Sequence, residues 1–415
     1  MPLLKKKFRT WIDIFDKEIK QFKNKFSIFL LLILIFFYFL ITNNYFSFYV
    51  GRYFDGCDLP WSPSNLYLKN IDVFKIYFSE LKNIKIHCSN YPAYSILNIF
   101  FFLPIGYFEL TVAKKIWLCI NLFFLFHIYI IICKKKLINE NIYNFLFLVF
   151  LFSKPTITML SIGQVGVMIL WAFVVFFYLQ NKKILNSAAY LIIGLKYSFF
   201  PIVFYYSLFN KLFKKIILIT LINILAVIIF AYKFETSLIS TLINPLIVGS
   251  EGGGGGGDLM SVLGNHPIFP INYMIIIGAS FFYFYIFYYK TYCNSENNLI
   301  CASLITITIF RHHIYDAIFL FPLLIYLIKS KNNWKYLCII IIFYFWFVYQ
   351  SNFLEQNGIF PVMYTKGFRI FNYFLLNILL LYFFLDNLKL NQTLCGLKMQ
   401  KIKKYFYKHE FKIKY

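Results

Sequence analysis

Long apolar runs, separated by short polar segments, are the feature that most restricts what this chain can fold into. Hydrophobic residues make up 60% of its 415 residues and charged residues only 14%, a balance that a water-soluble surface of this size does not tolerate. A membrane-crossing helix needs about 20 apolar residues, and fewer where protein or a water-filled cavity supplies polar partners. We therefore predict an all-α polytopic membrane protein with about twelve transmembrane helices. The twelve runs lie near 27–48, 115–133, 142–156, 165–180, 185–196, 199–210, 215–232, 270–289, 299–310, 314–328, 334–350 and 368–386.

The lysines predict how these helices are oriented. The net charge of +24 arises from short Lys clusters between the apolar runs, which is typical of cytoplasmic loops rather than of nucleic-acid binding. A further apolar segment, 92–108, would invert everything after it if it crossed the membrane. If this segment lies along the outer interface instead, the clusters from Lys134–Lys136 to the basic tail 387–415 all fall inside. We expect a single membrane domain over 1–415, both termini in the cytoplasm and no nucleic-acid partner.

This orientation leaves three outer loops, 49–114, 233–269 and 351–367, which we expect to carry the function. In the first loop, apolar residues recur near helical spacing over Leu66–Leu81, which predicts an interfacial helix. The second loop contains Gly252–Gly257, a run of glycines that cannot form regular structure and is expected to act as a hinge or linker. Because no Lys-Ser or Lys-Thr follows it, this run is not a phosphate-binding loop.

Two aspartates lie in the first outer loop, shortly after the opening apolar run. Asp55 and Asp58 are candidates for a general base, because a carboxylate near the membrane surface can take a proton from a sugar hydroxyl when partial burial raises its pKa. The alternative is that both are ordinary solvated loop residues. Cys57 and Cys88 share the same loop and either form a disulfide in an oxidising compartment or remain free thiols.

Two polar positions lie between apolar runs. Gln164, which follows Gly163 at an outer junction, offers donors and an acceptor that suit a sugar hydroxyl or a phosphate oxygen, or it ties two helices together. Lys196 and Tyr197 lie between two runs of about a dozen residues, and helices of that length reach only ~18 Å. Their junction is therefore expected below the outer surface, where a cation suits a phosphate. The alternative for Lys196 is snorkelling to the interface.

The stretch Arg311 to Asp316 lies at the outer junction of another pair of short runs. On an α-helix His312 and Asp316 would share a face, so that the carboxylate could orient the imidazole or keep it protonated. Two histidines and one aspartate could also ligate a metal, but His313 would point about 100° away and the spacing is not a standard zinc signature. We favour anion binding by Arg311, His312, His313 and Asp316 over a metal site. All of these polar positions fall on the outer side, which predicts one outward-facing cavity.

Several stretches taken together resemble the polyprenyl-phosphate-dependent glycosyltransferases of the GT-C superfamily, specifically the mannosyltransferase-like glycosyltransferase family 87. The similar stretches occur in order over about 90–325. They are Asn90-Tyr91-Pro92 through Pro104, Ala113 to Trp117 with Asn121, Pro155 to Gln164, Gly194 to Ser198 with Pro201, and His312-His313.

The resemblance implies a GT-C fold, an aspartate base in the first outer loop and a lipid-phosphate-linked sugar as donor. It implies inversion at the anomeric carbon, with basic residues stabilising the departing phosphate, and it adds Tyr91 to the substrate-binding residues. The family carries one loop aspartate in an Asp-Phe-like pair, whereas Asp55 and Asp58 compete here, and we favour Asp58 in Asp58-Leu59. Proline is also sparser around Tyr91 than in the family's Tyr-Pro-Pro pattern.

The leading hypothesis is therefore an enzyme, an inverting hexosyltransferase of the cytoplasmic membrane that needs no cofactor. It would move a sugar, for which the resemblance favours mannose, from a polyprenyl-phosphate donor to a glycolipid or glycan acceptor at the periplasmic or extracellular face. One alternative is a transporter or flippase of a lipid-linked saccharide, for which twelve spans is an ordinary count. Another is a polysaccharide polymerase or ligase, which shares the lipid-linked donor.

Overall fold

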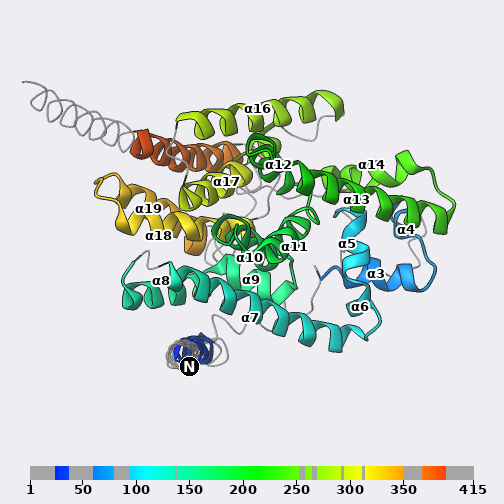
Figure 1. Ribbon diagram of the computed structural model, residues 1–415, viewed down its shortest axis with the longest axis horizontal. Coiled ribbons are helices and arrows are strands. Elements are labelled where there is room, and N and C mark those ends of the chain that lie inside the picture. Colours follow the sequence, from blue (N-terminus) through cyan, green and yellow to red (C-terminus); the bar gives the residue numbers. More distant parts are fainter. Residues whose placement is uncertain are drawn as a thin grey trace, which may run out of the picture.

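The protein is a helical bundle, and the part of the chain described in the computed structural model contains helices and no strands. The structure describes residues 24–36, 59–78, 94–135, 138–251, 258–263, 269–290, 294–310, 314–348 and 367–388. In Figure 1, α7 (Leu110–Lys134) runs along one side of the molecule and α16 (Phe269–Lys290) along the opposite side, with α9, α10 and α11 between them. The helix at the N-terminal end, Asn24–Phe36, lies beyond α7 and is seen nearly end-on.

The remaining helices follow the predicted apolar runs closely, so that each of the twelve runs contains a helix. Their bounds are α3 Trp61–Leu68, α4 Val73–Phe78, α5 Ile96–Phe101, α6 Leu103–Gly106, α8 Glu140–Phe152, α9 Lys154–Ile162, α10 Gly166–Tyr178, α11 Lys183–Ile193, α12 Phe200–Phe209, α13 Phe213–Phe234, α14 Leu238–Glu251, α15 Leu259–Leu263, α17 Ser295–Ile309, the 3₁₀-helix η1 Ile314–Leu320, α18 Phe321–Lys329, α19 Lys335–Phe343, the π-helix η2 Tyr344–Val348, and a last helix, Gly367–Leu388.

Three of these helices are long and apolar enough to cross a bilayer on their own: α7, α13 and Gly367–Leu388. Helices α8 and α9 together pass the same test, but they are bent by 57° at Ser153. The bend has a local cause, because Ser153 ends α8 with an extended backbone and its side chain accepts from Thr156 N. Pro155, in the first turn of α9, has no N–H to donate. The structure thus supports a helical membrane protein, and the count of twelve spans stays a prediction.

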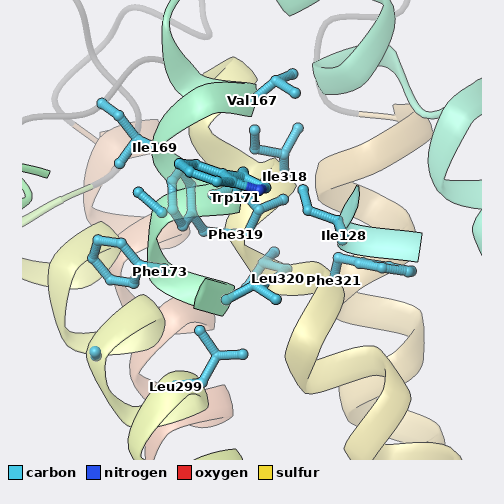
Figure 2. Packing of buried hydrophobic residues seen from close by; sticks show 14 of the residues in the cluster. Ile128, Val167, Ile169, Trp171, Phe173, Leu299, Ile318, Phe319, Leu320 and Phe321 are labelled. Atoms are coloured by element: carbon cyan, nitrogen blue, oxygen red, sulfur yellow. The ribbon is translucent and has the colours of Figure 1, made fainter. Parts of the chain in front are cut away.

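Helix α10 lies at the centre of the bundle. All of its residues from Gly166 to Tyr178 are buried, and it packs against α7, α9, α11, α17 and η1. Figure 2 shows Trp171 and Phe173 of this helix and Phe319 of η1 among aliphatic side chains, and the ring centroids of Phe173 and Phe319 are 5.5 Å apart. A helix that is apolar on every face has no solvent side, and in lipid it is held by close packing and by interhelical hydrogen bonds. Trp171 supplies one such bond, donating from Nε1 to His127 Nδ1 at 2.8 Å.

The two predicted interfacial segments are each broken into short helices. Segment 92–108 contains α5 and α6, which are far shorter than the roughly 20 residues that a crossing requires. The prediction of a single helix over Leu66–Leu81 is wrong, because α3 ends at Leu68 and a second helix, α4, starts at Val73. The reason is local chemistry, because Asn70 takes a left-handed conformation (φ 59°) and Asp72 Oδ1 accepts from Phe74 N at 2.8 Å, which starts a new helix.

The outer loop predicted over 233–269 contains two helices among its described residues, and its place outside the membrane stays a prediction. Glu235 ends α13 in a left-handed conformation (φ 52°), and the chain then continues as α14 and, after the glycine run, as α15. Helix α14 packs on α13 and buries Thr241, Pro245 and Val248 at helical spacing. The glycines Gly252–Gly257 lie outside the described residues.

The chain reverses direction between successive long helices, so their connections gather at two ends of the bundle. These two ends carry different side chains. At what we call the basic end, lysines contact the starts and ends of several helices. These contacts join Lys25 to Glu140, Lys135 to the ring of Tyr178, Lys215 to Asn186 and Lys329 to Glu296.

At the opposite end, which we call the junction end, the connections that carry Gly163, Gln164 and Leu195 meet the helix η1, which carries Asp316. Helix α7 joins the two ends, since Trp117 near its start contacts Gly163 and Lys135 follows its last residue. Three of the lysines at the basic end, Lys135, Lys215 and Lys329, belong to the predicted clusters, and the side of the membrane that each end faces stays a prediction.

Candidate functional site

Four of the predicted site residues lie in the described part of the chain, and all four belong to the junction end. Gln164 follows α9, Lys196 and Tyr197 lie between α11 and α12, and Asp316 lies in η1. The others lie outside the described residues. They are Asp55, Asp58, Tyr91, Arg311, His312 and His313, together with the possible disulfide partners Cys57 and Cys88.

Gly163 makes the turn that places Gln164. Its backbone is left-handed (φ 75°), a conformation that ends helix α9 and that favours glycine. A Cβ at this position would come within 3.1 Å of Leu59 Cβ and 3.5 Å of the Leu59 backbone. The Gly163 carbonyl accepts from Trp117 Nε1 at 2.8 Å. The turn is therefore held between α7 and the residue that follows Asp58 in sequence.

Gln164 ties together two distant segments of the chain. Its Oε1 accepts from the Tyr94 hydroxyl at 2.6 Å, and its Nε2 donates to the Tyr315 hydroxyl at 2.8 Å. The side chain is buried, with 5% of the residue exposed. Of the two roles that the sequence left open for Gln164, substrate ligand or interhelical tie, these contacts favour the tie.

Lys196 and Asp316, which are 120 residues apart, form a buried ion pair. Lys196 Nζ donates to both Asp316 carboxylate oxygens at 3.1 Å and lies 4.9 Å from the centre of the Phe199 ring. The Asp316 side chain is 1% exposed and that of Lys196 13% exposed. The lysine therefore does not snorkel to a surface. Its charge is also already balanced, so the pair by itself offers little net attraction to an anion.

The pairing predicted between His312 and Asp316 assumed an α-helix, and it stays a prediction. Residues 314–320 of this stretch are not α-helical. They form a 3₁₀-helix, in which residues three apart lie on one face, rather than an α-helix with residues four apart. Asp316 forms an ion pair with Lys196. His312 itself lies outside the described residues.

Tyr197 lies in the connection between α11 and α12, outside both helices, and is partly buried. Burial raises the pKa of its hydroxyl to about 12. The phenol therefore keeps its proton at neutral pH and can donate a hydrogen bond, but it is not suited to act as a base.

Sequence reasoning missed the segment that joins these positions. Ser95 donates from both N and Oγ to the Leu195 carbonyl, at 3.2 and 3.1 Å, while Tyr94 beside it contacts Gln164. Two consecutive residues thus link the turn at Gln164 to the residue before Lys196. The only signal in the sequence was their place directly after Tyr91-Pro92-Ala93, and Tyr315 had no role assigned although it adjoins Asp316.

The described residues of the junction end contain no cluster of metal ligands. Among the described residues, no group of three or more His, Cys, Asp or Glu could hold a metal ion. A cavity of about 260 Å³ lies at the basic end and is lined by Ile132, Cys133, Ile138, Glu140 and Tyr143. The chemistry available at the junction end is therefore a balanced ion pair beside a hydrogen-bonded amide and several tyrosine hydroxyls.

Comparison with known proteins adds no relative from which a function could be read. No protein-family model, no curated protein and no solved structure matches this chain.

Proposed function

We propose that this protein is a membrane glycosyltransferase with a GT-C fold that uses a polyprenyl-phosphate-linked sugar. It transfers the sugar, for which the family resemblance favours mannose, to a glycolipid or glycan acceptor. One observation carries the proposal: two helix connections and the helix η1, far apart in sequence, bring Gln164, Lys196 and Asp316 together at the end of the bundle opposite the lysine clusters.

The sequence position of Asp58 next to Leu59 makes it the candidate base. Asp58 directly precedes Leu59, and Leu59 lies against the Gly163 turn next to Gln164. The general base proposed here is Asp58, with Asp55 as the other candidate. It takes the proton of an acceptor hydroxyl while that oxygen bonds to the anomeric carbon. At the same time the bond from this carbon to the donor phosphate oxygen breaks and the lipid phosphate leaves with the electron pair.

The charge on the leaving phosphate needs cations that are not already balanced. Because Asp316 compensates Lys196, the residues that precede η1 in sequence, Arg311, His312 and His313, are proposed to supply this charge. Lys196 then holds η1 in position, and its ammonium group, shared with Asp316, also donates to the phosphate. Tyr91, which lies three residues before Tyr94, is proposed to contact the substrate.

The reaction is proposed for the outer face of the cytoplasmic membrane. The lysines of the basic end then face the cytoplasm, together with both chain termini, in agreement with the positive-inside rule. The junction end then faces the periplasm or the cell exterior, where lipid-linked sugars are the available donors and nucleotide sugars are not. Twelve spans, several of them short, are part of this proposal.

Transfer of a labelled sugar from a synthetic polyprenyl-phosphate sugar by the purified protein tests the proposal. We expect Asp58→Asn to lower the rate by about 100- to 10,000-fold, the usual contribution of a general base. Glu109→Gln is the matched control, because Glu109 is an exposed carboxylate at the start of α7. If Asp58→Asn and Asp55→Asn both keep the wild-type rate, the proposed base is wrong.

A transporter or flippase of lipid-linked saccharides is the second candidate, and the bent helix pair favours it. A span broken by 57° between α8 and α9 is the type of element that transporters use near a binding site. Movement of the saccharide across liposomes containing this protein, without any transfer of sugar, would favour this candidate over the enzyme.

A further inference from the structure

The last helix, Gly367–Leu388, carries two buried hydrogen-bond donors that nothing in the described structure satisfies. Arg369 Nε and Asn372 Nδ2 are both inaccessible to solvent, and neither has a partner among the described residues. Asn372 is fully buried, with 0% exposed. Buried donors are almost always paired in folded proteins, and a charged one is especially unfavourable when it is not. An acceptor supplied by another molecule would satisfy both donors of this helix.

The two donors lie on one face of the helix and one of them is held in a fixed direction. Residues three apart in an α-helix are neighbours, with their Cβ atoms about 5–6 Å apart. The Tyr344 hydroxyl donates to Asn372 Oδ1 at 3.1 Å, which fixes which way the amide is turned and leaves Nδ2 as the free donor. Both residues lie in the first two turns of a 22-residue helix, where the backbone N–H groups and the helix dipole also favour an anion.

This pair of donors is connected to the junction end by hydrogen bonds. The π-helix η2 supplies the link: Tyr344 contacts Asn372, and Trp346 Nε1 donates to the Ala317 carbonyl at 2.9 Å, one residue after Asp316. Lys196 and Arg369 differ in whether an ion pair balances their charge. Lys196 is balanced by Asp316, whereas Arg369 has no ion-pair partner among the described residues.

We propose that Arg369 and Asn372 form a binding site for a phosphate-type oxyanion. The planar guanidinium presents Nε–H beside a terminal N–H, an edge that matches two oxygens of a phosphate, and Asn372 Nδ2 donates to the same group or to its third oxygen. The phosphate comes either from a lipid headgroup or from solution. This site is separate from the residues proposed for glycosyl transfer and does not depend on that reaction.

Binding to the purified full-length protein in an uncharged detergent tests the site. The probes are n-decyl phosphate and, separately, inorganic phosphate, with n-decyl glucoside as the uncharged control, and the readout is calorimetric affinity together with the ligand-dependent rise in unfolding temperature. We expect decyl phosphate to bind the wild-type protein and decyl glucoside not to bind. Competition by inorganic phosphate at similar concentration identifies a free-phosphate site, and binding of decyl phosphate alone identifies a lipid-phosphate site.

Four variants distinguish the loss of a specific hydrogen-bond donor from the loss of positive charge in general. Arg369→Met and Asn372→Asp are each expected to weaken decyl phosphate binding by about 10- to 100-fold, because each removes a donor and the second also places a negative charge beside the ligand. Arg369→Lys keeps the charge without the planar edge, so a smaller loss is expected. Lys115→Met, which removes an exposed cation near the start of α7, is the matched control and should bind normally.

The proposal is overturned if the wild-type protein binds neither phosphate probe, or if Arg369→Met binds decyl phosphate as tightly as the wild-type protein does. The unfolding temperature of each variant without ligand shows whether it is folded. If Arg369→Met does not fold, the decyl phosphate affinities of Arg369→Lys and Asn372→Asp are compared with that of the wild-type protein. Unchanged affinity in both variants also overturns the proposal. Sugar transfer is not measured in this experiment, so failure of the proposed reaction leaves its outcome interpretable.

Discussion

At the scale of single residues, the pairing of Lys196 with Asp316 decides how the junction end is charged. A buried carboxylate without a partner is strongly unfavourable, whereas a neutral replacement of both partners is often tolerated. The ion pair joins η1 to the connection between α11 and α12, two segments 120 residues apart. The interaction is therefore important for holding the junction end together, whether or not Lys196 also contacts a substrate.

A double-mutant cycle tests this role. Lys196→Met should destabilise the protein by about 3–5 kcal/mol, because it leaves the Asp316 carboxylate buried and unpaired. Adding Asp316→Leu to Lys196→Met should restore most of the lost stability. The measurement is thermal unfolding in detergent, read by tryptophan fluorescence. Losses that simply add in the double variant would show that the two residues do not act as a pair.

At the scale of elements, the turn at Gly163 joins more parts of the site than any other short segment described above. Its left-handed backbone ends α9, its carbonyl accepts from α7, and Gln164 after it contacts both Tyr94 and Tyr315. A Cβ there would press on Leu59 at 3.1 Å. The turn has little room to adapt to a side chain.

Replacement of two glycines separates this effect from a general change in helix propensity. Gly163→Ala should destabilise the protein by at least about 1–2 kcal/mol, the usual penalty for a left-handed conformation with a side chain. Gly278→Ala is the control, because a Cβ at that position in α16 meets nothing within 4 Å, and its effect should stay below about 1 kcal/mol. Equal unfolding temperatures for the two variants would contradict the assigned role of the Gly163 turn.

At the scale of the whole molecule, the separation of two chemically different ends predicts the orientation in the membrane. The lysines at the basic end contact residues of neighbouring helices, while Gln164, Lys196 and Asp316 lie at the junction end. Lysine-rich loops remain in the cytoplasm. The connections at the junction end should therefore face the opposite compartment.

Reporter fusions test this orientation directly. A fusion after Lys182, between α10 and α11, should report a cytoplasmic location, and one after Thr236, between α13 and α14, should report an outer location. The two sites are at opposite ends of the bundle, so each serves as the control for the other. A cytoplasmic signal after Thr236 would break the proposed arrangement and move the candidate site to the inner face.

Much of this molecule could be predicted from local sequence, because its helices depend on apolar runs. The predicted runs 215–232 and 270–289 are close to the observed α13 and α16, since a segment without polar partners in lipid must satisfy its backbone by forming a helix. Prediction failed where a few side chains redirect the backbone. Asp72 starts a new helix within the predicted Leu66–Leu81 helix, and α14 forms in a segment expected to be a loop.

The candidate site could also be predicted only in part from local sequence. Hydrophobicity and lysine spacing by themselves determined that the chain forms a helical membrane protein, and they identified Gln164, Lys196 and Asp316 as polar groups at the ends of short apolar runs. Only the tertiary structure decided that Lys196 is neutralised by Asp316, that Gln164 is held by two tyrosines, and that Arg369 and Asn372 keep unsatisfied donors. The physical reason is that apolar periodicity acts over one or two turns, whereas these pairings depend on how helices far apart in sequence pack together.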